Sequence, residues 1–383
     1  MTSPQMGLTF QTAGKIQFGR GAAAGAADAI AAIGRAAFLV HGATAARADW
    51  LKDALIAAGC RVTTFACPNE PDIAGVEAGV AAARAAGAEV VVSLGGGAPI
   101  DLGKAVAALV PATRPMLDHL EVVGQGLPLD HAPLPFVALP TTAGTGAEVT
   151  KNAVINVPEA RRKVSLRDDR MLPDLAIVDP ALTDGAPRSV TLASGLDAVT
   201  QVIEPYICTK SNRLTDALCR DAIPLGLAAL AKLMEAEVTQ ARDDLAWVSL
   251  CGGLALANAG LGAVHGLAGP IGGMSPAPHG AVCGVLLPYV LEANAAEAGP
   301  HAAARLADVR GWIAAVLGGT AQDAPATLAR WSATHGLPRL GAMGLAREDL
   351  PAIAEAAGGS SSMKANPVPL SAAALLGVLE RAL

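Results

Sequence analysis

Four polar side chains stand in apolar, helix-like stretches of the second half of the chain. Asp197 and Gln201 lie four residues apart in GLDAVTQVIEPY, a spacing that places both on one face of a helix. His265 and His279 lie in GLGAVHGLAGPIGGMSPAPHG, otherwise built of small and aliphatic residues. A carboxylate, an amide and two imidazoles can together bind a divalent ion such as zinc or iron. Either histidine alone is more simply a structural imidazole, so only the set indicates a metal.

Two glycine-rich segments each follow a short aliphatic run. In VVVSLGGGAPIDLGKAVAAL, three consecutive glycines stand between a predicted strand and a predicted helix. Such a turn lets backbone N–H groups reach a pyrophosphate, which the helix dipole favours, although a tight turn without a ligand needs the same residues. The segment LPTTAGTGAEVTK adds the hydroxyls of Thr141, Thr142 and Thr145. Two such loops at the carboxyl ends of parallel strands favour a nucleotide site.

A third glycine pattern, FGRGAAAG, matches the spacing GxGxxA with Gly19, Gly21 and Ala24. It lies close to the N-terminus, and no acidic residue ends a second strand ~20 residues later, as a dinucleotide fingerprint requires. We therefore predict that this segment begins a helix and binds no cofactor.

Strand and helix patterns divide the chain into two halves. Alternating β-rich and Ala-rich helical stretches predict βαβ units and a parallel sheet in the first half. The strand candidates are residues 36–42, 61–67, 88–94, 134–140 and 175–180, and residues 150–168 are predicted to form a hairpin on the sheet edge. Beyond about residue 187 the apolar residues recur at helical spacing. We predict an α/β domain over 1–187 and an all-helical domain over 188–383.

The composition limits the class of protein. Of 383 residues, 52% are hydrophobic but only 3% aromatic, so the core is built from Ala, Val, Leu and Ile. A net charge of −6 without basic runs argues against a nucleic-acid partner. Six scattered cysteines without CxxC spacing indicate reduced thiols. Charged residues or Pro interrupt the apolar runs before they reach the length of a membrane span. Since no secretory signal is visible, we expect a soluble, cytoplasmic protein without a membrane partner.

Four segments resemble the signature segments of the iron-containing (group III) alcohol dehydrogenases, in family order and at family spacing: GGGAPID, PTTAGTGAEVT, GLDAVTQVIEPY and GLGAVHGLAGPIGGMSPAPHG. SSMKANPVPL near the end is also similar, so the resemblance covers essentially the whole chain. It implies a dehydroquinate-synthase-like fold, with a dinucleotide-binding α/β domain, a helical domain and an active site in the cleft between them. The family reaction is the reversible NAD(P)-dependent interconversion of an alcohol and an aldehyde or ketone.

The resemblance also assigns individual residues. The pyrophosphate loop matches Gly95, Gly96, Gly97 and Asp101. The loop around the diphosphate and nicotinamide matches Thr141, Thr142 and Thr145, and Lys163 matches a lysine near the nicotinamide ribose. The four metal-ligand positions match Asp197, Gln201, His265 and His279. Asp197, His265 and His279 are therefore the expected catalytic residues, and the implied cofactors are NAD or NADP and a divalent metal, Fe²⁺ or Zn²⁺.

The chain departs from the family pattern at several of these positions. Gln201 replaces a ligand that is normally His, and a neutral amide oxygen ligates weakly. Gly269 replaces a common His that is a candidate proton relay, and Gly42 replaces the Asp that reads the adenosine ribose. Without that carboxylate a 2′-phosphate is not repelled, so NADP is permitted. Ala98 replaces a common Ser of the glycine loop.

We therefore expect an oxidoreductase that transfers a hydride between a nicotinamide and a small-molecule alcohol or carbonyl, with a bound metal as Lewis acid and ribose hydroxyls or water carrying the proton. Three alternatives remain open. They are a metal-independent enzyme similar to maleylacetate reductases, a sugar-phosphate cyclase on the same fold, and a non-catalytic NAD(P)-binding homologue. The cyclase requires clustered basic residues, which the helical half does not show near its motifs. We also expect a homo-oligomer, with a dimer as the simplest case.

Overall fold

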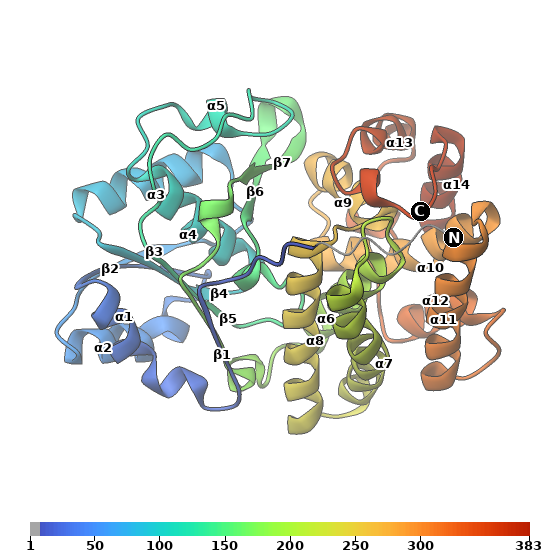
Figure 1. Ribbon diagram of the computed structural model, residues 1–383, viewed down its shortest axis with the longest axis horizontal. Coiled ribbons are helices and arrows are strands. Elements are labelled where there is room, and N and C mark those ends of the chain that lie inside the picture. The colour runs from blue at the N-terminus through green and yellow to red at the C-terminus, as the bar shows by residue number, and fades with distance from the viewer. Residues whose placement is uncertain (1–7) are drawn as a thin grey trace.

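The first half of the chain forms a six-stranded parallel sheet. The structure, a computed structural model, describes residues 8–383, and its α/β half lies beside a helical half (Figure 1). All five predicted strands are present, and the sheet gains a further edge strand that the sequence patterns did not indicate. In spatial order the strands are β1 (Lys15–Phe18), β8 (Leu175–Val178), β5 (Phe136–Pro140), β4 (Val90–Gly95), β2 (Ala36–His41) and β3 (Arg61–Ala66).

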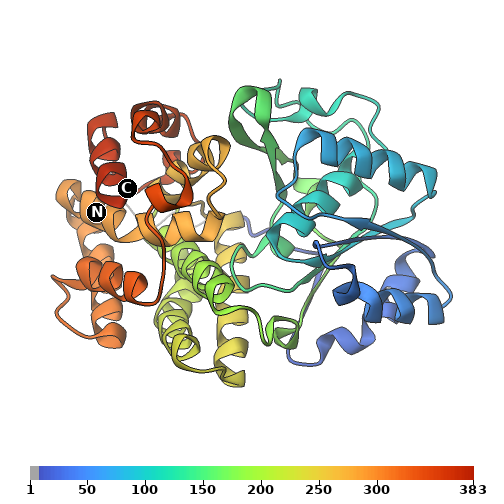
Figure 2. The ribbon, with the colours of Figure 1, turned by 180° about the vertical axis from the view of Figure 1, so that it is seen from behind.

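Helices cover both faces of this sheet, as Figures 1 and 2 show from opposite sides. Alternate residues of β4 point to opposite faces, as the pleat of a strand requires. Val91 packs in the core shared with α3 (Ile73–Ala85) and α4 (Gly97–Leu109). Val90 and Val92 pack in the core shared with α1 (Ala26–Ile33) and α2 (Asp49–Ala57). A continuous run of Val therefore suits this strand, which is buried on both sides.

The predicted hairpin forms, but it does not lie on the edge of the main sheet. β6 (Asn152–Val157) and β7 (Arg162–Arg167) make a separate two-stranded antiparallel sheet. β6 contacts α4, and β7 contacts a helix of the second half, α9 (Ala263–Met274). Most apolar residues of the hairpin, including Ile155 and Leu166, are buried in the core of the α4 face, whereas Val154 is 37% exposed. The expectation of an edge position was wrong because these side chains are covered by packing on helices.

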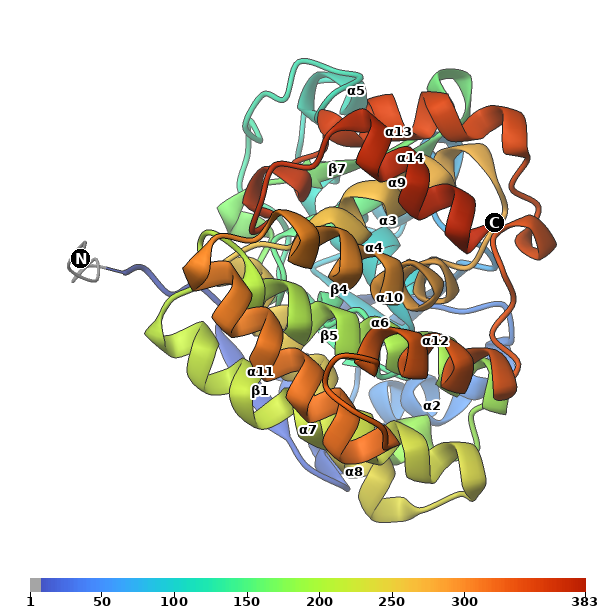
Figure 3. The ribbon, with the colours of Figure 1, turned by 90° about the vertical axis from the view of Figure 1, so that its right-hand side faces the viewer.

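Every regular element within residues 188–383 is a helix, as predicted. α6 (Arg188–Ile207) lies at the centre, against α7 (Arg213–Glu235), α8 (Thr239–Asn258) and α10 (His279–Glu297). The remaining helices pack around them, as the view in Figure 3 shows. Besides α9, they are α11 (Pro300–Leu317), α12 (Ala324–Thr334), α13 (Leu350–Gly358) and α14 (Ala372–Ala382). Over residues 8–383 no single helix has the length and apolarity to cross a membrane, and only α8 and α9 together, bent by 95°, meet that criterion.

Candidate metal and cofactor site

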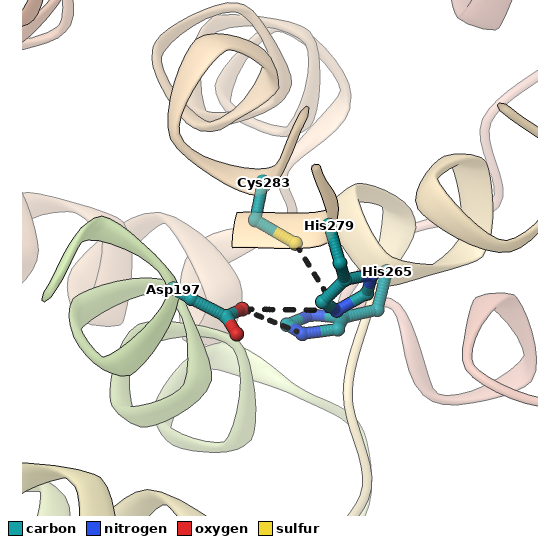
Figure 4. A group of neighbouring side chains, drawn as sticks. All are labelled: Asp197, His265, His279 and Cys283. Carbon is teal, nitrogen blue, oxygen red and sulfur yellow. Dashed lines mark hydrogen bonds and ion pairs between the residues drawn. The ribbon is translucent and has the colours of Figure 1, made fainter. Parts of the chain in front are cut away.

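Four side chains from three helices converge inside the helical half (Figure 4). Asp197, His265, His279 and Cys283 each offer one potential ligand atom, and these atoms all lie within 4.8 Å of one another. Nε2 of His265 is 3.5 Å and Nε2 of His279 is 3.8 Å from Oδ1 of Asp197. The Sγ atom of Cys283 is 3.6 Å from Nε2 of His279. Three of the four side chains were expected together from the sequence, and Cys283 was not.

Small residues let α10 approach α6 closely enough to form this cluster. A Cβ atom on Gly280 would lie 2.5 Å from the backbone oxygen of Ala193, and one on Gly284 would lie 2.7 Å from the Leu196 side chain. Either contact would force the helices apart. Gly280 and Gly284 directly follow His279 and Cys283, so the two glycines set the distance of those ligand atoms from Asp197.

Glu204, on the same helix as Asp197, determines which nitrogen of His265 faces the cluster. The Nδ1 atom of His265 donates a 2.6 Å hydrogen bond to Oε2 of Glu204. The backbone N–H of Val264 donates to the other carboxylate oxygen at 2.7 Å, so Glu204 also caps the N-terminus of α9. Nε2 of His265 is left to point at Asp197. Glu204 was not among the residues predicted from the sequence, although its place seven residues after Asp197 puts both on one helix face.

Asp197, His265 and Cys283 are at most 9% exposed, whereas the His279 side chain is 36% exposed. Two polar atoms of the cluster need a partner. Oδ1 of Asp197 and Nε2 of His265 have no hydrogen-bond partner within the described part of the chain, and their residues are 1% and 9% exposed. Burial acts to raise the pKa of Asp197, but the neighbouring His279 and His265 hold that pKa below its usual value. Interaction with the neighbouring Cys283 and Asp197 raises the pKa of His279 to about 9, although desolvation opposes the rise. A buried carboxylate facing two imidazoles fits a divalent cation.

Gln201 joins this cluster to the second glycine loop. It lies one helical turn after Asp197 and is 3% exposed. Its Nε2 atom donates a 2.5 Å hydrogen bond to the backbone oxygen of Thr145. The amide nitrogen is therefore occupied by the α/β half of the molecule, which leaves the carbonyl oxygen as its potential ligand atom.

The two glycine loops lie against each other at the carboxyl edge of the sheet. β4 and β5 are neighbours, and the N–H of Thr141 donates to the oxygen of Gly95 at 2.9 Å. A Cβ atom on Gly96 would lie 3.0 Å from the Thr142 hydroxyl. Likewise, a Cβ atom on Gly97 would lie 2.9 Å from the Thr145 methyl group. Larger residues at these positions would separate the two loops. Within the described residues the N-cap position of α4, Gly96, offers no side-chain hydrogen bond to the first N–H groups of the helix.

A buried lysine fastens the second loop to α4. The Nζ atom of Lys104 donates to the backbone oxygens of Ala147, Thr150 and Asn152 at 2.7–2.9 Å. Burial lowers its pKa to about 8, although Asp101 and Glu148 act to raise it. Burial raises the pKa of Asp101 to about 6, against the opposing effect of Lys104.

The remaining predicted cofactor residue, Lys163, lies where the hairpin meets α9. Its ammonium group forms an ion pair with Glu70. A Cβ atom on Gly272 of α9 would lie 2.6 Å from Nζ of Lys163, so the helix backbone passes directly over this side chain. Lys163 is therefore positioned by both halves of the molecule.

The rejected glycine pattern near the N-terminus is satisfied internally. The N–H groups of Gly21 and Ala23 donate to the carboxylate of Asp179 at 3.1 and 3.0 Å. A short 3₁₀ turn (Ala22–Gly25) leads from there into α1. The segment begins a helix, as predicted, and a side chain already occupies two of its anion-binding N–H groups.

Comparison with known proteins places these features in a family. Residues 13–180 match the family described as iron-containing alcohol dehydrogenase, and residues 191–383 match the C-terminal part of that family. Alcohol dehydrogenase 4 of Saccharomyces cerevisiae is 36% identical over 320 residues, 82% of this chain and 81% of the relative. Lactaldehyde reductase of Escherichia coli is 34% identical over 76% of this chain and 75% of its own. The crystal structure of a 1,3-propanediol oxidoreductase superposes with a TM-score of 0.89 at 29% identity, covering 98% of this chain and 100% of that one.

Proposed function

The chain belongs to the iron-containing alcohol dehydrogenase family and is an NAD(P)-dependent oxidoreductase of alcohols and carbonyl compounds; on that premise we propose that it interconverts small aliphatic alcohols and aldehydes with the help of a divalent metal. We assign cofactor binding to residues 1–187 and metal and substrate binding to residues 188–383. The convergence of Asp197, His265 and His279 beside the Thr145 loop carries this proposal. The relatives named for lactaldehyde and 1,3-propanediol support a small substrate.

In the proposed site Asp197, His265 and His279 hold the metal, iron or zinc. A metal held there would supply Lewis-acid polarisation of the substrate oxygen. Glu204 keeps Nε2 of His265 directed at the metal position. Gln201 can add only its carbonyl oxygen, a weak neutral donor.

The cofactor residues are proposed from the paired loops at the sheet edge. Free N–H groups at the start of α4 suit the negative charge of a pyrophosphate, and the threonine hydroxyls suit phosphate or ribose oxygens. Lys163, at the junction with α9, would lie near the nicotinamide ribose, and its ion pair with Glu70 holds it in place. The proposed residues are Gly95, Gly96, Gly97, Asp101, Thr141, Thr142, Thr145 and Lys163. We also propose a homo-oligomeric, cytoplasmic enzyme.

The test is a screen of short-chain alcohols and aldehydes, with NAD(H) and with NADP(H), on metal-depleted protein before and after metal is restored. We expect turnover that returns with iron or zinc. Equal rates in depleted and restored protein would contradict the role of the metal and favour a metal-independent reductase, which reduction of maleylacetate would then identify. Absence of turnover with every substrate and both cofactors would favour a non-catalytic homologue.

A further inference from the structure

We propose that Cys283 is a fourth protein ligand of the metal centre and binds as a thiolate. The centre then has one carboxylate, two imidazoles and one sulfur donor, instead of depending on the amide of Gln201. This inference rests on the proposed function only in taking the cluster as a metal site. It concerns which atoms bind the metal and not which substrate reacts.

The separations of the ligand atoms fit a single ion. Metal–nitrogen and metal–oxygen bonds of about 2.0–2.1 Å and a metal–sulfur bond of about 2.3 Å place neighbouring ligands of a tetrahedral ion about 3.3–3.6 Å apart. The observed separations are 3.5 Å and 3.8 Å from Asp197 to the two histidines and 3.6 Å from Cys283 to His279. The other three separations are within 4.8 Å, so side-chain movements of about 1 Å would bring the four atoms onto one tetrahedron.

The helix places the sulfur at this position. His279 and Cys283 are four residues apart on α10, so their side chains lie on one face, one turn apart. Figure 4 shows the sulfur of Cys283 directed at the His279 ring, on the side where Asp197 approaches. Cys283 is 0% exposed, so its sulfur is shielded from solvent. Gly284 lies against Leu196 and keeps α10 close to the helix of Asp197.

Charge and unsatisfied atoms support the same assignment. Asp197 and a Cys283 thiolate together supply two negative charges, which neutralise a divalent ion in a buried setting where an unbalanced charge is costly. Oδ1 of Asp197 and Nε2 of His265, which lack partners within residues 8–383, would both gain one. Meanwhile the amide nitrogen of Gln201 is bonded to Thr145. A sulfur donor also suits zinc better than ions that prefer oxygen ligands, such as Mg²⁺ or Mn²⁺.

The experiment detects the metal–sulfur bond by absorption spectroscopy. The full-length protein is stripped of metal and loaded with Co²⁺ without oxygen, cofactor or substrate. A cobalt–thiolate bond produces a near-ultraviolet charge-transfer band, whereas oxygen and nitrogen ligands leave only the visible bands. The variants are Cys283→Ala and Cys283→Ser. The matched control is Cys251→Ala, which removes another fully buried thiol of the helical half, on α8.

We expect the band in the unaltered protein and in C251A, and its loss in both Cys283 variants. Those variants should also bind Co²⁺ at least about tenfold more weakly, the scale of effect seen when support for a metal ligand is removed. Circular dichroism shows whether each variant folds, and C283S serves if C283A does not. The proposal is overturned if the unaltered protein shows no thiolate band, if it binds no cobalt, or if C283S keeps the band and the affinity.

The outcome of the cobalt experiment can be told apart from the outcome of the substrate screen. Carbonyl reduction by a protein that shows no thiolate band would leave the function standing and remove Cys283 from the ligand set. A thiolate band in a protein that turns over no alcohol or aldehyde would do the reverse.

Discussion

The carboxylate of Glu204 accepts a 2.6 Å hydrogen bond from Nδ1 of His265, and this bond fixes Nε2 as the nitrogen that faces Asp197. A histidine bound to a metal commonly donates its other ring N–H to a carboxylate, which orients the ring and makes it more basic. Here the carboxylate comes from the helix that also carries Asp197, so one helix sets the position of two potential ligands.

Glu204→Gln is expected to weaken metal binding by about 10–100-fold. The amide is nearly isosteric but lacks the negative charge that stabilises the Nδ1–H of His265, while its oxygen can still accept a hydrogen bond from the Val264 N–H. Titration with Zn²⁺ against a competing chelator measures the change. Glu237→Gln, which alters a carboxylate paired with Arg242 and not with the cluster, is the control. Equal zinc affinities in E204Q and the unaltered protein would show that this carboxylate does not orient a ligand.

Gln201→Leu is expected to raise the KM for the nicotinamide cofactor by about tenfold and to change Co²⁺ or Zn²⁺ affinity by less than about threefold. The substitution leaves the Thr145 carbonyl without its donor, and an unsatisfied buried group costs about 1–3 kcal/mol. The control is Thr200→Val, because among residues 8–383 the Thr200 hydroxyl bonds only to the backbone oxygen of Leu196 on its own helix. If metal affinity falls sharply and the cofactor KM does not change, Gln201 is a metal ligand.

Local patterns were enough to predict the parallel strands and the all-helical second half. The apolar runs of β4 and β5 reflect burial that a strand experiences throughout its length. β3 is exposed or half-buried and was recognised from its β-branched and aromatic residues. β1 was not predicted because its four residues, Lys15–Phe18, are exposed or half-buried and contain no apolar run. The hairpin was recognised by its alternation, but its packing on α4 and α9 depends on residues far away in the chain.

The site was predictable where a polar residue interrupts an apolar helix. Asp197, His265 and His279 stand out in this way, whereas Cys283 resembles any buried apolar residue and lacks CxxC spacing. Its one available signal was the spacing of four residues from His279. The direction of the Gln201 amide was beyond sequence reasoning, because its partner Thr145 is 56 residues away and is brought close only by contact between the two halves.

Gly42→Asp is expected to lower kcat/KM for NADPH by about tenfold or more relative to NADH. β2 ends at His41, and apart from its chain neighbours a Cβ atom at Gly42 would meet no described atom within 4 Å, so packing does not prevent a side chain from starting there. It would repel a 2′-phosphate and could accept a bond from a ribose hydroxyl. Gly42→Asn, equal in size but neutral, is the control for kinetics with both cofactors. An equal loss with NADH and NADPH in G42D would place the adenosine ribose elsewhere.

Gly269→His is expected to raise kcat several-fold and to add an ionisation with a pKa near that of histidine to its pH profile. Residue 269 lies one turn after His265 on α9, and beyond its own helix turn a Cβ atom there would meet no described atom within 4 Å. An imidazole at this position could carry the proton that we expect ribose hydroxyls or water to carry in the unaltered enzyme. Gly269→Ala separates this effect from the gain in helix stability of about 1 kcal/mol on removing glycine. A kcat equal to that of G269A, with an unchanged pH profile, would argue against a relay at this position.

Glu148→Gln is expected to stabilise the protein relative to the unaltered protein more at pH 8 than at pH 5. Burial raises the pKa of Glu148 to about 7, while hydrogen bonding to its own backbone and the charge of Lys104 oppose the rise. Between the ordinary pKa of a glutamate and 7, the folded protein holds a proton that the unfolded chain has released. Stability therefore falls as pH rises through this window, by about 3 kcal/mol in total, and stays low above it. Gln cannot ionise, so the substitution removes this dependence of the free energy of unfolding on pH.

Urea midpoints of E148Q and the unaltered protein at pH 5, 6, 7 and 8 measure the difference, with E237Q as the control at an exposed carboxylate. A difference between E148Q and the unaltered protein that is the same at every pH would mean that Glu148 ionises normally in the folded state.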